Sequence, residues 1–409
     1  MRRVAVFVLL ASLVSGLALA QPPADKKAPP AKAGDKDKKD GSPAVTDAPK
    51  LADLPDTKDV PAPEAKSFKS ADGVMLNGLF YKSAKGGSAP VVMLLHEYKK
   101  DPNDSRWDGT AKLLAASGFN VLRFAFRGHG DLKALHSKDI DAGEFFGGAW
   151  SGINKALVNA PNPAAKATVD TRDFRSGYQP MLVQDLAAAR TLLDQMNDTG
   201  ECNTSSIYLL GAGETVNLGF LFLASEWHRE RERVKTFFGA VPPVSARRPL
   251  LGDVGPAGQD YAGCVWLGPT TDPANYPLAT VKEWVTDVSG LKLRNETPML
   301  FLYGGLDAKG KLGATAYYDT VLKAGAKAQA QGGSGLPPIG HLTYKEEVGK
   351  GVKNLGATLL GNNLGTEQRV LAYLAAMEKE RKNKVRKARD FERPLYIDVR
   401  SFGLMAQGG

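Results

Sequence analysis

The sequence predicts an open α/β fold: a mostly parallel, doubly wound sheet with helices on both faces and an antiparallel hairpin at its start. Short apolar runs without polar alternation, such as residues 90–95, are typical of strands buried on both faces. Stretches with helical spacing of apolar residues, such as residues 181–196, separate these runs. With 409 residues, 43% of them hydrophobic, the chain can bury a sizeable core.

The individual elements follow in chain order. Residues 68–71 and 74–81 are expected strands joined at Asp72-Gly73, because Asp-Gly accepts the positive φ that a two-residue hairpin turn requires. Continuous apolar runs predict further strands at residues 90–95, 120–126, 206–210, 234–241 and 298–303. Apolar residues at helical spacing predict helices at residues 107–117, 181–196, 216–227, 314–324 and 365–382.

Two long stretches interrupt this alternation. They are residues 131–178, which are rich in Gly, Ala and Asn, and residues 242–276. In parallel sheets, long excursions after a strand lie over the carboxyl edge, where ligands bind. We therefore expect two lid-like insertions above a binding cleft, within a folded domain that spans residues 66–380.

The start of the chain has the features of a secretory signal peptide. Arg2 and Arg3 precede an uncharged, mostly apolar run that ends in Ala-Leu-Ala. We expect residues 1–20 to be removed and the mature protein to be periplasmic, at the cell surface or extracellular. An uncleaved anchor is the alternative, since a run of about 17 residues is marginal for a bilayer that takes about 20.

Polar segments flank the folded domain on both sides. Residues 21–65 are rich in Pro, Ala, Lys and Asp and contain no aromatic residue, which predicts a disordered linker. The C-terminal tail, residues 381–409, is basic. Residues 378–393, which overlap its first part, carry many Lys and Arg and are expected to continue the last helix. This tail is either a patch for anionic polymer or lipid headgroups or a solvated helix end whose cations suit the helix dipole. The net charge of +9 is modest and does not demand nucleic acid as a partner.

Four short motifs follow one another along the domain: Leu94-Leu95-His96-Glu97, Arg127-Gly128-His129-Gly130, Tyr303-Gly304-Gly305-Leu306-Asp307 and Ile339-Gly340-His341. Together they resemble the α/β-hydrolase fold superfamily, which includes esterases, lipases and dienelactone hydrolases. The resemblance covers residues 66–380 apart from the two excursions. It implies that Asp307 and His341 are the acid and the base of a catalytic triad, or that they persist as a structural pair.

The stretch Gly211-Ala212-Gly213-Glu214-Thr215 stands where the family has its nucleophile elbow, Gly-x-Ser-x-Gly. Gly213 takes the place of the serine, and Thr215 takes the place of the second glycine. Glycine accepts the left-handed backbone of this turn but brings no oxygen, sulfur or carboxylate. The resemblance therefore implies that the turn persists while the nucleophile is absent.

These observations lead to two hypotheses of function. In the first, the protein lacks serine-hydrolase activity and binds a small-molecule ligand or partner of the cell envelope. In the second, it hydrolyses ester, thioester or amide bonds with an unconventional nucleophile such as Glu214, or with a water activated by His341. Besides Glu214, Asp307 and His341, the candidate binding residues around the cleft are His96, Glu97, Tyr98, His129, Gly213 and Thr215.

Other site classes are disfavoured. Gly211-Ala212-Gly213 could begin a dinucleotide fingerprint, but Val216 stands where that pattern requires Gly or Ala, so no cofactor is expected. The five histidines show no ligand spacing, so no metal is expected either. Cys202 and Cys264 are expected at opposite edges of the sheet, about 17 to 20 Å apart against a limit of about 7 Å for a disulfide. Two free thiols are therefore expected.

Overall fold

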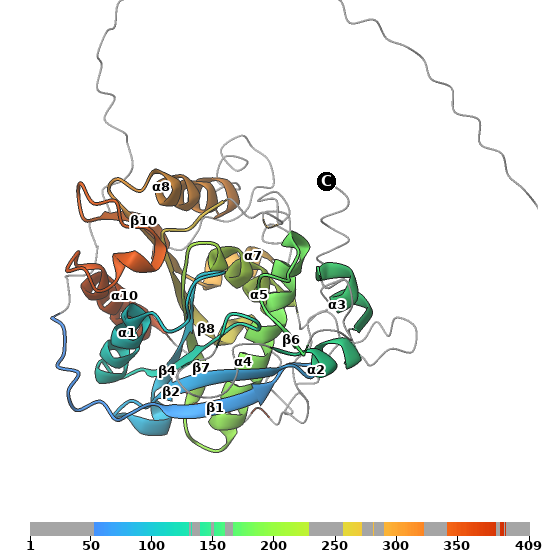
Figure 1. Cartoon of the computed structure of the whole chain (residues 1–409). Coiled ribbons are helices and arrows are strands. Elements are labelled where there is room, and N and C mark those ends of the chain that lie inside the picture. Colours follow the sequence, from blue (N-terminus) through green and yellow to red (C-terminus); the bar gives the residue numbers. More distant parts are fainter. Residues whose placement is uncertain are drawn as a thin grey trace, which may run out of the picture. The chain divides into compact units, whose positions relative to one another are not determined.

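An eight-stranded sheet between two layers of helices forms the centre of the folded body in this computed structural model (Figure 1). The expected signal peptide and most of the expected linker lie outside the described residues. The structure describes residues 53–130, 132, 140–148, 151–159, 167–228, 257–271, 281, 290–322, 342–381, 385–387 and 389.

The strands of this sheet lie in the order β1-β2-β4-β3-β7-β8-β9-β10. β1 and β2 are antiparallel to each other, and β2 is antiparallel to β4. All neighbours from β4 to β10 are parallel, which confirms the mostly parallel sheet with an antiparallel hairpin at its start. The strands are β1 Glu64–Lys69, β2 Met75–Tyr81, β3 Pro90–Leu95, β4 Asn120–Phe124, β7 Asn203–Ala212, β8 Tyr261–Leu267, β9 Met299–Gly304 and β10 Tyr344–Val348.

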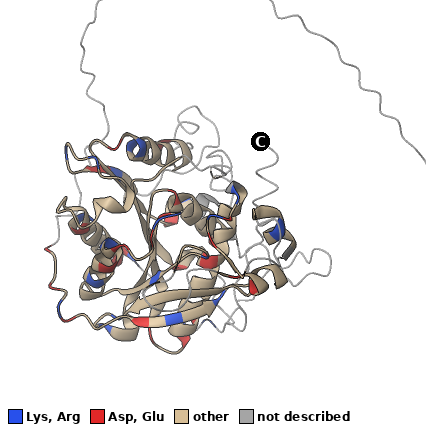
Figure 2. Ribbon diagram, in the orientation of Figure 1, with Lys and Arg blue, Asp and Glu red and all other residues tan. Residues whose placement is uncertain are grey.

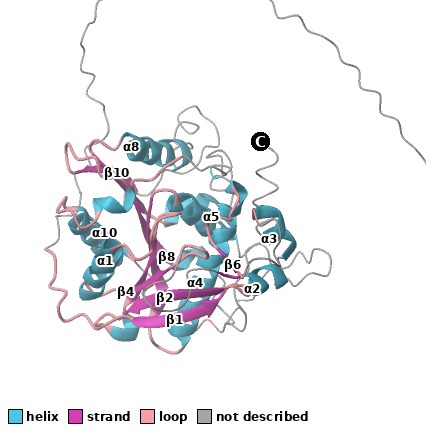
Figure 3. Ribbon diagram, viewed as in Figure 1, coloured by secondary structure: helices cyan, strands magenta, loops and turns pink. Residues whose placement is uncertain are grey.

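Helices cover both faces of the sheet, as the cyan ribbons on either side of the magenta strands show (Figure 3). α1 (Ser105–Ala116) and α10 (Thr366–Glu380) pack on one face, and α4 (Val183–Asp198) and α5 (Thr215–His228) pack on the other. The remaining helical segments are α2 Ala142–Gly147, α3 Ser151–Leu157, α7 Gly290–Glu296, α8 Ala308–Thr315, the 3-10 turns η1 Gly86–Ser88, η3 Ser176–Leu182, η4 Ala257–Asp260 and η6 Gly356–Leu359, and the π-helical turn η5 Ala316–Leu322.

Strand β3 shows why an uninterrupted apolar run becomes a central strand. Val91, Met93 and Leu95 belong to the core on the α4 and α5 side. Val92 and Leu94 belong to the core on the α1 and α10 side. Because successive side chains point to opposite faces of a sheet, a strand covered on both faces needs apolar residues at every position.

The hairpin turn is wider than the expected two residues. β1 ends at Lys69 and β2 begins at Met75, while the N–H of Ser70 donates to the carbonyl of Val74 at 3.0 Å. Gly73 has the expected positive φ, +90°. The turn opens because Asp72 is drawn inward, where its carboxylate binds the guanidinium of Arg127 at 2.5 Å.

Residues 242–276 are not simply a lid, which corrects the sequence-based assignment. Their segment Tyr261–Leu267 forms β8, a fully buried strand between β7 and β9. The strand predicted at residues 234–241 lies outside the described part of the chain. Cys264 therefore lies within the sheet, paired with Leu209, rather than beyond its carboxyl edge.

The other excursion, residues 131–178, carries small elements of its own. Ile140–Asp141 (β5) and Thr168–Val169 (β6) pair in a separate two-stranded sheet beside α2 and α3. Its aromatic residues Phe145, Phe174 and Tyr178 join the core on the α4 side. The N–H of Thr171 donates to the carbonyl of Gly128 at 3.0 Å, so this excursion packs on the loop that follows β4.

The last helix is shorter than expected. α10 ends at Glu380, and the backbone of Arg381 is extended, so the described residues beyond it do not continue the helix. Several of them bind the folded body instead of facing solvent, as described below.

Among the described residues, no helix is both long and apolar enough to cross a bilayer. Acidic and basic residues are interspersed over the described elements (Figure 2).

Two further boundaries differ by a few residues. The expected helix at residues 314–324 begins earlier, at Ala308, because Asp307 caps it, and it continues as the π-helical turn η5. β1 begins at Glu64, inside the expected linker. Val60, which precedes it, packs against the core on the α1 side.

Candidate functional site

The turn between β7 and α5 has the expected left-handed backbone. Gly213 has a φ of +60°, and its N–H donates to the carbonyl of Leu267 in β8 at 2.9 Å. The carbonyl of Gly213 accepts a hydrogen bond from the N–H of Thr270 at 3.3 Å. These two bonds fix the turn at the carboxyl end of the central strands, where ligands bind in sheets of this kind.

The carboxylate of Glu97 stands beside Gly213. A Cβ on Gly213 would lie 3.1 Å from Glu97 Oε1 and 3.3 Å from its Cγ. A Cβ on Gly356, which has a φ of +51°, would overlap the same oxygen, so glycine is required there. The N–H of Ala357 donates to this carboxylate, yet burial raises the pKa of Glu97 above its usual range. Glu97 therefore lines the space that a nucleophilic side chain at residue 213 would enter.

Thr215 and Glu214 follow the turn and differ in what they can offer a ligand. The Thr215 hydroxyl donates to the carbonyl of Ala212 at 2.7 Å, so it is occupied by the backbone. Glu214 is half-buried. Burial and the nearby charge of Glu214 together raise the pKa of Tyr98 to about 12. Glu214 and Tyr98 therefore lie close together beside the turn.

The two histidines of the neighbouring loops are neutral. The N–H of Phe126 donates to Nε2 of His96 at 3.1 Å, so Nδ1 carries the proton and donates to the carbonyl of Glu97 at 2.9 Å. Both ring nitrogens of His96 are thus hydrogen-bonded to backbone groups. His129 Nδ1 lies 3.0 Å from the carbonyl of Arg127, and its buried Nε2 has no hydrogen-bond partner among the described residues. Burial lowers the pKa of His129 to about 4.

Asp307 is buried, at 2% exposure, and caps a helix. Its Oδ1 accepts the N–H of Gly310 at 2.8 Å at the start of α8, and a Cβ on Gly310 would overlap the other carboxylate oxygen. Burial raises the pKa of Asp307. The expected partner, His341, lies outside the described residues.

Sequence reasoning missed the ion pairs that hold the loop after β4. The Arg127 side chain donates from Nε to Asp185 Oδ1 at 2.7 Å and from Nη2 to Asp72 Oδ1 at 3.0 Å. Asp185 lies in α4, and Asp72 lies in the hairpin turn. All three side chains are at most 1% exposed. An arginine within a glycine-rich loop after a buried strand signals such an anchor, but its partners are distant in the sequence.

A hollow lies in the described part of the chain, away from this turn. It is lined near the amino end of β4 and along α10 by Asp53, Pro55, Ser117, Phe119, Leu371 and Ala375. Within the described part of the chain, no three His, Cys, Asp or Glu side chains are placed to hold a metal ion.

Comparisons with known proteins were made at the level of sequence and of structure. No protein-family model matches the chain, and no curated protein matches it. An esterase from Pyrococcus furiosus is similar to it, with a TM-score of 0.42 and 13% identity over 77% of this chain and 90% of the esterase. A dienelactone hydrolase from Anabaena variabilis has a TM-score of 0.36 and 15% identity over 78% of this chain and 97% of its own. For an acylaminoacyl peptidase from Pyrococcus horikoshii the TM-score is 0.38 and the identity 14%, over 83% of this chain and 43% of the peptidase.

The topology is more informative than any single neighbour. An antiparallel hairpin begins the sheet, and five crossovers then build its parallel part, with β4 and β7 on either side of β3. A left-handed turn joins the longest strand, β7, to α5, and an aspartate follows β9. Such a turn at the top of a parallel sheet is the structural context that the elbow motif requires. By this arrangement the chain has the α/β-hydrolase fold.

Proposed function

We propose that the protein binds a ligand or partner at the turn between β7 and α5 and does not catalyse through a covalent serine intermediate. The observation that carries the proposal is the apex of this turn. Gly213 has no side chain, and the adjoining space is lined by the carboxylate of Glu97. A catalytic triad without its nucleophile keeps only residual catalysis, roughly a thousandfold over water.

The chemistry near the turn supports a ligand that donates hydrogen bonds or carries positive charge. Glu97 and Glu214 are carboxylates, and the Nε2 lone pair of His129 has no partner among the described residues. The ring of Tyr98 already has the ammonium group of Lys99 over it, at 5.4 Å. Amines and polyols suit such acceptors, whereas a carboxylate or phosphate would be repelled.

The first experiment separates binding from hydrolysis. The purified chain is assayed against p-nitrophenyl esters of several acyl lengths and with a fluorophosphonate probe that labels active serines. We expect neither turnover above the buffer rate nor labelling, but we expect an amine or polyol that binds to raise the Tm in a concentration-dependent way. Ester turnover that disappears in His341→Ala would instead establish hydrolysis that depends on His341 and end the proposal.

Two engineered variants test the role given to Glu97. In Gly213→Ser the new side chain stands 3.1 Å from Glu97 Oε1 on a backbone with φ of +60°, so we expect no fluorophosphonate labelling. Gly213→Ser with Glu97→Ala provides the missing space, and the matched Glu97→Ala variant alone controls for the loss of the carboxylate. If the probe labelled Gly213→Ser as strongly as the double variant, Glu97 would not obstruct the apex.

We also propose that the protein is exported and acts in the cell envelope. The charged and apolar start of the chain, residues 1–20, is the basis of this proposal. The intact mass of the protein recovered from the extracytoplasmic fraction should correspond to a chain that starts after residue 20. A full-length chain found only in the cytoplasm would contradict it.

A further inference from the structure

A closed guanidinium site lies at the amino ends of β7 and β8, at the opposite edge of the sheet from the candidate functional site. Arg389 fills it. Its Nη2 donates to Asp260 Oδ1 and to Ser205 Oγ, each at 3.0 Å. Its Nε donates to Thr204 Oγ1 at 3.1 Å and lies 3.7 Å from Asp194 Oδ1. Arg389 is 5% exposed, so the site encloses the charged group almost completely.

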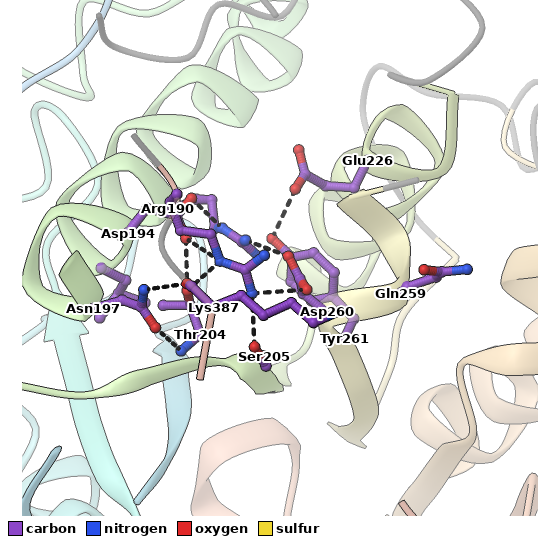
Figure 4. A network of polar contacts seen from close by, with 12 residues as sticks. Arg190, Asp194, Asn197, Thr204, Ser205, Glu226, Gln259, Asp260, Tyr261 and Lys387 are labelled. Atoms are coloured by element: carbon purple, nitrogen blue, oxygen red, sulfur yellow. Dashed lines mark hydrogen bonds and ion pairs between the residues drawn. The ribbon is translucent and has the colours of Figure 1, made fainter. Parts of the chain in front are cut away.

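Arg389 supplies the second guanidinium group for the carboxylates of Asp194 and Asp260. Arg190 of α4 lies between the same two carboxylates, with Nε 2.8 Å from Asp194 Oδ2 and Nη2 2.6 Å from Asp260 Oδ2 (Figure 4). Two guanidinium groups thus face two carboxylates, all of them buried. Removal of Arg389 leaves one arginine for two buried carboxylates, which is the situation in which a broken buried ion pair is most destabilising.

The rest of the segment is fastened by polar contacts as well. Arg381 Nε donates to Ser206 Oγ at 2.8 Å. The amide of Asn197 donates to the carbonyl of Lys387 at 2.7 Å. Val385 between them is 74% exposed and adds nothing to the core. The described residues after α10 are therefore held by hydrogen bonds and charge rather than by apolar burial.

We propose that Arg381, residues 385–387 and Arg389 are a releasable attachment, and that the body carries a binding site for the arginine side chain of a peptide. In this chain the site is occupied by its own Arg389. The selectivity follows from the geometry, because Nε and Nη2 reach different acceptors on β7 and η4. A single ammonium group cannot match this fork, so lysine is a poor substitute.

The test cuts this attachment after the protein has folded. A protease recognition sequence replaces residues 382–384, and the cut chain is separated from its C-terminal fragment by gel filtration. We expect the Tm to fall by about 4 to 7 °C on removal of the fragment. A synthetic peptide of residues 385–393 should restore the Tm in a concentration-dependent way. The same peptide with Arg389→Lys should bind at least about tenfold more weakly.

Two outcomes would overturn the proposal: an unchanged Tm after removal of the fragment, or equal binding of the arginine and lysine peptides. A second pair of variants covers the case in which the cut chain does not stay folded. In the uncut chain, Arg389→Ala and Arg389→Lys should both lower the Tm. Full stability of Arg389→Lys would show that the site accepts any cation and would equally reject an arginine site.

Discussion

Glu97 is a partly buried carboxyl group whose charge is disfavoured by its surroundings. Burial raises its pKa, and the single N–H of Ala357 only partly offsets this effect. When the pKa of a carboxyl group is higher in the folded than in the unfolded state, the free energy of unfolding falls as the pH rises from the unfolded-state pKa to the folded-state pKa. Glu97→Gln keeps an acceptor for Ala357 without the charge. We expect it to raise the free energy of unfolding at pH 7 by about 0.5 to 1 kcal/mol, measured by denaturant titration.

Glu64→Gln provides the matched control for Glu97→Gln. The ion pair with Lys82 lowers the pKa of Glu64, which is the opposite direction, so this variant should not gain stability. If Glu97→Gln proved less stable than the unmodified chain at pH 7, the charged form of Glu97 would have to be favourable. The account of the candidate site given above would then be wrong.

His129 provides a second test at the scale of one residue. Burial lowers its pKa from 6.5 to about 4, so the folded protein holds the neutral form while the unfolded chain takes up a proton. The resulting stability is present above pH 6.5 and is lost as the pH falls towards 4. His129→Asn keeps a donor near the carbonyl of Arg127 but does not titrate. Between pH 7 and pH 4.5, we expect the unmodified chain to lose about 2 to 3 kcal/mol more than this variant.

Unfolding in urea at both pH values, followed by circular dichroism, measures this difference. His96 also has a lowered pKa, to which the nearby His129 contributes, so the measured difference includes this coupling between the two histidines. Parallel loss of stability in the two proteins would mean that His129 is not neutral in the folded state.

At the scale of elements, single side chains hold together segments that are far apart in the sequence. Arg127, in the loop after β4, binds Asp72 of the hairpin turn and Asp185 of α4. One guanidinium thus links the edge of the sheet to a helix on its face. The loop that carries His129 is fixed by the same bonds, so the candidate site depends on contacts outside it.

Asp307 plays a comparable part for α8. Its side chain accepts the N–H of Gly310 as the N-cap of that helix. Asp307→Ala should lower the free energy of unfolding by about 1 kcal/mol, whereas Asp307→Ser, which can also cap, should lose much less. Guanidinium titration of the two variants measures this contrast. Equal losses would show that the carboxylate matters for a reason other than capping.

The elements that the sequence predicted well are those with a local signal. β3, β4, α4 and α5 lie close to their expected ranges, because their apolar runs and helical spacings follow directly from burial. The left-handed turn at Gly213 was expected from the resemblance of its motif to the elbow, and glycine accepts that backbone without strain. β8 was missed, because Tyr261–Leu267 lies in a stretch whose surroundings lack the strand and helix rhythm.

The parts that could not be predicted depend on contacts between distant residues. Nothing in the residues around Glu97 indicates that its carboxylate stands beside Gly213, since the packing of two loops determines it. The contacts of the basic tail could not be predicted for the same reason. A run of Lys and Arg is usually solvated, but Arg389 finds carboxylates on α4 and η4 that no local pattern reveals.

For the whole molecule, the two cysteines report on global opening. Cys202 and Cys264 are free thiols with 0% exposure. Burial raises the pKa of both thiols, so neither is a nucleophile in the folded state. We expect Ellman's reagent to modify neither in native buffer and both in 6 M guanidinium, at about the rate of an unstructured peptide thiol.

Intermediate guanidinium concentrations make this a test of cooperativity. Cys202 precedes β7 and Cys264 lies within β8, so both are exposed only when the centre of the sheet opens. Their labelling should follow the unfolding transition seen by circular dichroism. Labelling of one thiol well before that transition would indicate that the sheet opens in parts.

The position of Arg389 in the sequence also has a consequence for folding during synthesis. The side-chain hydrogen bonds of Arg389 join residues that are 129 to 185 positions apart in the sequence. During synthesis, Asp194 and Asp260 therefore leave the ribosome with Arg190, and Arg389 follows only later. The ion pairs of Arg389 cannot contribute to folding before residue 389 has been made.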